Sequence, residues 1–172
     1  MGSSDDLDFN YEIACKCFNS LKNKLYKNPK IPDQYKEIVS DQLKCNTVRT
    51  CTNEDINSSY CMTHTAVIRE DKQTTQVQMV YNCNSKTNRN QKSVNDFLEW
   101  GVNLYPNLLD AILKFLENQV AFRRDLKKAF LMIEISEEDR KYLKFLWFPE
   151  ESDNSVQMLQ LNRLSFRLTT SP

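Results

Sequence analysis

The chain has 172 residues, a length typical of one domain, and 40% of them are hydrophobic, which suits a folded core. Its 23 Lys and Arg residues balance 23 Asp and Glu residues, so the net charge of zero excludes strong attraction of the whole molecule to nucleic acid or anionic membrane. Only two glycines occur, which excludes the glycine-rich phosphate loops of P-loop and Rossmann proteins.

Two amphipathic helices are predicted in the first part of the chain. Apolar side chains recur at helical spacing over Tyr11–Tyr26, and the prolines of "NPKIP" end that pattern. A second helix is expected to begin at Pro32 and to end near Cys45 and Asn46. Residues 46–60 are polar and without period, so they predict a loop.

A β-hairpin is predicted next. The runs "TAVIRE" and "TQVQMVY" are short and rich in β-forming residues, and they flank the turn-prone "DKQT". Because side chains alternate along a strand, one face of the second run would carry Val77, Met79 and Tyr81, and the other face Gln76, Gln78 and Val80.

Two helices and a strand are predicted after the hairpin. Ser93 caps a short helix, and Asp96 stands three residues later as in a capping box. A longer apolar helix is expected from Pro106 to Glu117. The run "QVAF", residues 119–122, is expected to be a brief strand that leads into "RRDLKKAF".

The last part predicts a short helix and two strands. Ser136 precedes three acidic residues, which is typical of a helix N-terminus. The runs "KFLWF" and "VQMLQLNRL" are strand-like and are joined by the turn-prone "PEESDN". Helices and strands without regular βαβ alternation indicate an α+β domain.

The N-terminal region predicts an intracellular, cytoplasmic protein. Residues 1–9 are acidic and lack the apolar stretch of a secretory signal, and Asp6 replaces the Ser or Thr of a myristoylation site. No run approaches the about 18 apolar residues of a membrane span, so no membrane partner is expected. In this compartment the six cysteines are expected to be reduced.

A zinc site is an alternative use of the cysteines. Cys61 and the only histidine, His64, are three residues apart and would bind zinc with two other thiolates. The spacings lack the paired C-x2-C pattern of convincing zinc sites, so buried or incidental thiols are the simpler interpretation.

Asp125 has two interpretations on the residues alone. It lies among four cations, Arg123, Arg124, Lys127 and Lys128, and such clusters are commonly solvated surface charges. A carboxylate at the end of a buried strand is also well placed to bind Mg²⁺, which prefers oxygen ligands.

A resemblance to a known family favours the second interpretation. The segment "VAFRRDLKKAFLMIEISEEDRKYLKFLWF" resembles the part of the reverse transcriptases of BEL/Pao-type LTR retrotransposons that delivers the first catalytic aspartate. Upstream, "YCMTHTAVIREDKQTTQVQMVYNCNSKT" resembles the family's fingers hairpin, and "SVNDFLEWGVNLYPNLLDAILKFLENQ" resembles the helical passage that follows it. Downstream, "LNRLSFRLTTSP" is similar to the family's "R…PFGLTSSP" loop.

The resemblance implies a domain organisation and a reaction. Residues 60–172 would be a truncated fingers and palm domain of a right-hand polymerase, and residues 1–59 a helical segment before it. The family's reaction is RNA-templated addition of deoxynucleotides to a primer, so the implied partner is an RNA/DNA primer–template and the implied cofactor is Mg²⁺, with no small organic cofactor. The oligomeric state is left open.

The resemblance also assigns roles to individual residues. Asp125 and the Leu126 carbonyl would bind the two metal ions, and Phe130 would be the aromatic steric gate beneath the sugar. Without the resemblance, Phe130 is equally well an ordinary core residue. Nucleotide binding would involve Leu126, Ala129, Phe130 and Gln78, and template or primer binding would involve Arg123, Arg124, Lys127 and Phe166.

The sequence departs from the family in ways that predict an inactive chain. Gln78 replaces an arginine that binds the triphosphate, Asn82 replaces an aspartate, and "SFR" at 165–167 replaces "PFG". No Asp-Asp pair follows Asp125, although the family's Y-x-D-D turn completes the metal site. We therefore expect no polymerase activity from this chain alone.

Three further expectations follow. A non-catalytic remnant would bind nucleic acid weakly through basic residues, namely Arg123, Arg124, Lys127, Lys128, Arg140, Lys141 and Lys144. A cysteine-rich interaction module would instead carry stoichiometric zinc. In either case, "VQMLQLNRL" is expected to be an unpaired apolar edge, because the family's following strands are missing.

Overall fold

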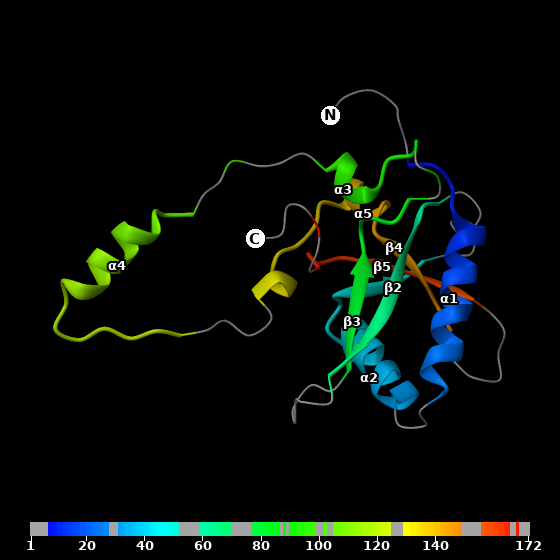
Figure 1. The fold of residues 1–172 in the computed structure, drawn as a ribbon, viewed down its shortest axis with the longest axis horizontal. Helices are drawn as coiled ribbons and strands as arrows, with labels where there is room; N and C mark the ends of the chain where they lie inside the picture. The colour runs from blue at the N-terminus through cyan, green and yellow to red at the C-terminus, as the bar shows by residue number, and fades with distance from the viewer. Residues whose placement is uncertain are drawn as a thin grey trace.

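The computed structural model describes most of the chain, namely residues 7–27, 31–51, 59–69, 77–86, 88, 90–98, 102, 105–124, 129–148, 156–165 and 168. Within these residues the protein is a mixed α+β fold built on one five-stranded sheet, which confirms the predicted class. Figure 1 shows the body of the fold around this sheet and one helix, α4, extended away from it.

The two N-terminal helices form as predicted. Helix α1 spans Tyr11–Leu25 and helix α2 spans Ile31–Lys44. Helix α1 packs on strands β2 (Cys61–Ile68) and β4 (Lys144–Trp147), and Figure 1 shows it running alongside β2. Each of the two helices buries one apolar face in the core, which explains why these sequences are helical. The buried residues are Ala14, Phe18, Leu21 and Leu25 of α1 and Ile31, Pro32, Tyr35 and Val39 of α2.

The end of α2 places the first strand. Asn46 adopts a left-handed backbone conformation with φ of 53°, which asparagine tolerates better than most residues. The Thr47 N–H then bonds the Gln42 carbonyl at 2.9 Å, and the chain enters strand β1, Val48–Thr50. The loop predicted for 46–60 was therefore wrong at β1, whose three residues are strand because they pair with β5.

The predicted hairpin is confirmed. Strand β2 pairs antiparallel with β3, Val77–Asn82, and the register sets His64 opposite Tyr81. Val77 and Tyr81 are buried, which fits the face predicted to carry them. The connecting residues 70–76, with Gln76 and the "DKQT" turn, lie outside the described residues.

The last strands lie in the middle of the sheet. The strand order is β1-β5-β4-β2-β3, with β5 at Gln157–Leu161. Strand β4 pairs parallel with β2 and antiparallel with β5, and β1 pairs antiparallel with β5. The expectation of an unpaired edge at "VQMLQLNRL" was wrong, because β5 has a neighbour on both sides.

Short helices cover one end of the sheet. The predicted capping box is confirmed in α3, Val94–Phe97, where the Ser93 side chain accepts from Asp96 N–H and the Asp96 carboxylate accepts from Ser93 N–H. Helix α5, Glu137–Arg140, starts after Ser136 as predicted, without a side-chain cap bond. The rings of Phe97 and Tyr142 are 5.0 Å apart, so α3 and α5 lie together.

Helix α4 spans Leu108–Leu116, close to the predicted 106–117, and the Asn107 side chain caps it by accepting from Leu109 N–H at 2.9 Å. The predicted strand at 119–122 was wrong, because these residues are exposed and form no strand. A four-residue apolar run becomes a strand only where a neighbouring strand pairs with it. The turn η2, Ala129–Met132, follows.

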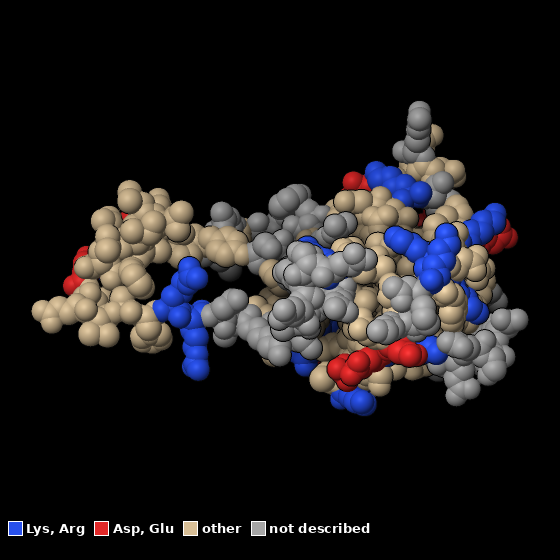
Figure 2. Space-filling model, turned by 60° about the horizontal axis from the view of Figure 1, so that its bottom comes forward, with Lys and Arg blue, Asp and Glu red and all other residues tan. Residues whose placement is uncertain are grey.

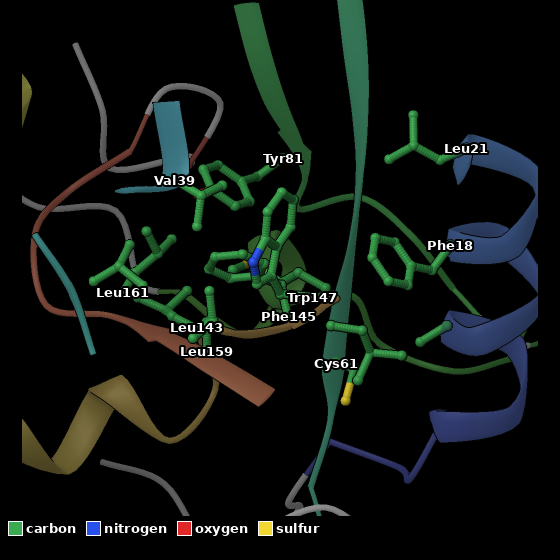
Figure 3. Close-up of a cluster of buried hydrophobic side chains, with 14 of the residues drawn as sticks. Phe18, Leu21, Val39, Cys61, Tyr81, Leu143, Phe145, Trp147, Leu159 and Leu161 are labelled. Atoms are coloured by element: carbon green, nitrogen blue, oxygen red, sulfur yellow. The ribbon is translucent and has the colours of Figure 1, made fainter. Parts of the chain in front are cut away.

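One hydrophobic core holds the body together. Its members come from α1, α2 and the sheet strands, so residues on both sides of position 60 contribute to it. Figure 3 shows side chains of these elements converging around Phe145 and Trp147 of β4. Fully buried members of this core include Tyr35, Met62, Phe145, Leu146 and Leu159.

Candidate nucleic-acid interface

The central part of the predicted catalytic segment lies outside the described residues. This applies to Asp125, Leu126 and Lys127, and also to Phe166 of the downstream loop. The predicted metal ligands are therefore not placed by the structure, and their roles stay predictions from the resemblance.

The neighbours of that segment are placed. Arg123 and Arg124 are exposed at the end of the extended chain that follows α4. Ala129 and Phe130 begin the turn η2 and are half-buried, and Phe130 packs against the core. This packing is what an ordinary core residue would show, so the alternative interpretation of Phe130 has a structural basis.

Gln78 lies on β3, an edge strand, opposite Val67 of β2, and its side chain is half-buried. The predicted site residues that the structure describes thus belong to three different elements: β3, the chain after α4, and η2. None of them lines either of the two hollows that flank α1.

A buried polar chain lies at the centre of the body. The Tyr35 hydroxyl and His64 Nδ1 are 2.7 Å apart, and His64 Nε2 is 2.9 Å from the Leu146 carbonyl oxygen. A carbonyl can only accept, so Nε2 carries the hydrogen and Nδ1 accepts from the tyrosine. The rings of Phe18 and Phe145 lie 5.3 and 5.4 Å from the imidazole.

This environment fixes the protonation state of the histidine. Burial lowers the pKa of His64 to about 4, although its hydrogen bond to the Leu146 carbonyl acts in the opposite direction. Burial raises the pKa of Tyr35 far above its usual value, so the hydroxyl stays protonated as a donor. His64 is therefore a neutral structural residue at pH 7.

The zinc alternative is not favoured by this geometry. Both ring nitrogens of His64 already have partners, and Cys61, three residues earlier on the same strand, projects to the opposite face. Burial raises the pKa of the Cys61 thiol to about 12, which disfavours the thiolate that binds metal. Among the residues that the structure describes, no three His, Cys, Asp or Glu side chains form a group that could hold a metal ion.

Two of the cations expected to contact nucleic acid have structural roles instead. Lys144 is buried, and its Nζ donates to Ser59 Oγ at 2.9 Å. Arg140 is buried as well, and its guanidinium donates to the Ile135 carbonyl at 2.8 Å and pairs with Glu134 at 3.1 Å. The expectation that Arg140 and Lys144 bind phosphate was wrong, because a buried cation that is hydrogen-bonded to protein groups is not accessible to a phosphate.

A groove beside α1 was missed by the sequence analysis. It is open to solvent and lies between α1 and the hairpin β2–β3. Lys16, Ser20 and Lys24 recur every four residues along α1 and form one wall. The opposite wall comes from the hairpin β2–β3, with Thr63, Thr65 and Asn82.

The groove combines two cations with hydroxyl and amide groups, which is the chemistry that binds phosphate oxygens. The spacing of Lys16, Ser20 and Lys24 is visible in the sequence, and it was the only available signal. That Thr63 and Thr65 face these lysines depends on how α1 packs on β2, which periodicity does not reveal.

A second, shallow hollow lies between α1, α2 and the end of β4. Its lining is mostly aromatic, and Phe18 and Phe148 stack there with ring centres 4.7 Å apart. Lys22 places its ammonium 4.4 Å from the Phe148 ring centre, so that cation is already engaged.

The charged side chains are distributed rather than concentrated. On the face shown in Figure 2, the Lys and Arg side chains of the described residues form several separate groups. This agrees with the net charge of zero, and it limits phosphate binding to local sites.

Comparisons with known proteins add no assignment. No protein-family model matches the chain, and no curated protein matches it. Within the described residues, every helix is too short or too polar to cross a membrane.

Proposed function

We propose that this chain is a fingers and partial-palm fragment of a BEL/Pao-type reverse transcriptase, which binds an RNA/DNA primer–template and does not polymerise on its own. The observation that carries the proposal is the order of its segments along the sequence: a hairpin, a helical passage, "RRDLKKAF", "EEDR" and "KFLW". Support comes from the element types at these residues, since β2–β3 is a hairpin and β4–β5 an antiparallel pair.

The proposed lack of activity rests on the metal ligands. A two-metal mechanism needs several carboxylates around ions about 3.5–4 Å apart. Asp125 is one such carboxylate, and no adjacent aspartate pair follows it in this sequence. The Leu126 carbonyl adds a neutral ligand, so Mg²⁺ would be held weakly.

A primer-extension assay tests this part of the proposal. With Mg²⁺ or Mn²⁺, a labelled primer on an RNA template and all four deoxynucleotides, the purified chain is expected to give no product above that of Asp125→Ala. Asp125→Ala is the matched control because it removes the only carboxylate that the resemblance assigns to the metal. Template-dependent extension that this substitution abolishes would contradict the expectation.

Binding of the primer–template is the second test. Arg123 and Arg124 are exposed beside the unplaced segment, so they are free to meet phosphates. Fluorescence anisotropy with a labelled RNA/DNA hybrid is expected to give an affinity that falls steeply with salt. In the double variant Arg123→Ala/Arg124→Ala, the slope of log K against log salt should become less negative by about 2.

A matched control separates this effect from a change in overall charge. Lys44→Ala and Lys114→Ala together also remove two exposed cations, one at the end of α2 and one on α4. This pair should leave the salt slope unchanged. Absence of salt-sensitive binding by the unaltered chain, or an equal loss in both double variants, would refute the proposed role of the arginines.

The groove beside α1 supports a second candidate function, a sequence-independent polyanion-binding module. The observation that favours it is the pair Lys16 and Lys24 facing Thr63 and Thr65 across an open groove. In the same anisotropy assay, Lys16→Ala/Lys24→Ala would abolish binding if the groove is the site. Retention of full affinity in that variant would exclude the groove and leave the arginine site.

A further inference from the structure

Residues 105–124 form an extended arm, and every one of them is exposed. Figure 1 shows α4, the only helix among residues 105–124, well outside the body of the fold. The inference drawn from this arm is independent of the proposed function, because it rests on the apolar side chains of the arm and not on Arg123 and Arg124.

The exposed surface of α4 is unusually apolar. Each of its six large hydrophobic side chains is between 47% and 74% exposed: Leu108, Leu109, Ile112, Leu113, Phe115 and Leu116. At about 100° per residue these positions form one continuous face centred on Ile112. Asp110 and Lys114 stand two residues either side of Ile112, so both charges project from the opposite side of the helix.

The amount of apolar surface exceeds what an isolated chain commonly exposes. The six side chains of α4 expose about 700 Å², and Val120 and Phe122, at 85% and 86% exposure, raise this to about 1,000 Å². The largest apolar patch on a typical monomer is roughly 300–600 Å². A stable interface buries roughly 800 Å² on each partner, and the apolar face of α4 reaches an area of this size only together with Val120 and Phe122.

We propose that two copies of this chain associate through their arms, with the apolar faces of the two α4 helices packed antiparallel about a twofold axis near Ile112. A twofold interface requires a surface that complements itself, and a uniform stripe of Leu, Ile and Phe does so. In this arrangement Leu108 of one copy lies near Leu116 of the other, and Asp110 and Lys114 remain in water. No charge is buried, so the desolvation penalty that opposes many interfaces does not arise.

A second copy fits the arm better than a lipid surface does. Helices that lie on anionic membranes carry a basic polar face. The polar side of α4 carries one acidic and one basic residue, Asp110 and Lys114, so it lacks the basic polar face of such helices.

Sedimentation velocity on the full chain, without nucleic acid, tests the proposal. Between 1 and 100 µM in about 150 mM salt, the unaltered protein should shift from its monomer mass of 20.3 kDa toward twice that value. Because the association is hydrophobic, raising the salt to about 500 mM should not weaken it. A protein that remains monomeric at 100 µM would overturn the proposal.

The informative variant is Ile112→Glu. In the dimer it places two negative charges, one from each copy, at the centre of the paired faces. Its dimer dissociation constant should rise by about 100-fold or more. The matched control is Ser40→Glu, which makes the same change in charge at an exposed position of α2, outside the arm, and should leave the dissociation constant within about twofold. Thermal unfolding confirms that Ile112→Glu is folded, since Ile112 lies outside the core.

Other outcomes are decisive as well. Dimerisation that survives Ile112→Glu would mean that a different surface joins the copies, and would overturn the proposal. Sedimentation with vesicles of phosphatidylcholine and phosphatidylserine is the parallel measurement. A monomeric protein whose vesicle binding is lost in Ile112→Glu would identify a membrane as the occupant of the arm and would refute the second copy.

Discussion

Phe145→Ala is expected to lower the free energy of unfolding by about 3–5 kcal/mol, the usual cost of removing a buried phenyl ring. Phe145 is 0% exposed at the centre of β4, with its ring 5.1 Å from that of Tyr81 and 5.4 Å from that of His64. Its neighbours come from three strands, so they cannot all collapse into the space that the ring leaves.

Chemical denaturation monitored by circular dichroism measures this effect. Phe9→Ala is the matched control, because Phe9 is 66% exposed and the same atoms are removed from the surface. The control should change the free energy of unfolding by less than about 0.5 kcal/mol. If the two variants lost equal stability, Phe145 would not occupy the core position described here.

Acidification is expected to remove about 3 kcal/mol of stability between pH 6.5 and pH 4, through His64 alone. The pKa of His64 falls from 6.5 when unfolded to about 4 in the fold. Between these values the unfolded chain binds a proton that the folded chain does not, so stability falls as the pH is lowered through this window. The contribution of His64 to the free energy of unfolding is constant above pH 6.5 and levels off below pH 4.

The chain is suited to this measurement because His64 is its only histidine. The titratable groups that contact the ring, Tyr35 and Tyr81, have pKa values raised by burial and stay neutral throughout the window. Urea unfolding at a series of pH values should show the slope in the unaltered protein and its loss in His64→Gln. A flat profile in the unaltered protein, or the same slope in the variant, would contradict a buried neutral imidazole.

Local signals in the sequence were sufficient for the helices and for the hairpin. Apolar residues at helical spacing predicted α1 and α2, and Ser93 with Asp96 predicted the start of α3. These features depend on residues within a few positions of each other, so a reading along the chain detects them.

Features that depend on distant partners were not predictable in this way. Strand β1 has only three residues, and its pairing with β5 is what makes it a strand. At 119–122 a strand was predicted but does not form, because this apolar run has no strand beside it in the described part of the chain. The sheet order likewise depends on the parallel pairing of β2 with β4, which no local sequence pattern predicts.

The candidate site was predictable to an even smaller extent. Lys144 reads as a phosphate-binding cation in the sequence, and only the fold reveals that Ser59 holds it in the interior. A site at Lys16 and Lys24 was not predicted, because the sequence pattern does not reveal that α1 packs beside Thr63 and Thr65. The polarity of a residue is local, but the direction in which it faces is set by tertiary packing.

The sheet order has a consequence for how the chain acquires its structure during synthesis. Strands β4 and β5 occupy the middle of the sheet, yet they come last in sequence among the strands of the described residues. Arg49 and Gln160, which pair across β1 and β5, are 111 positions apart in the sequence. Closing so long a loop is slow, and until residue 161 has left the ribosome β1 lacks the strand with which it pairs. Until β5 is made, the core residue Val48 of β1 stays exposed in the nascent chain, and apolar surface exposed in this way promotes aggregation.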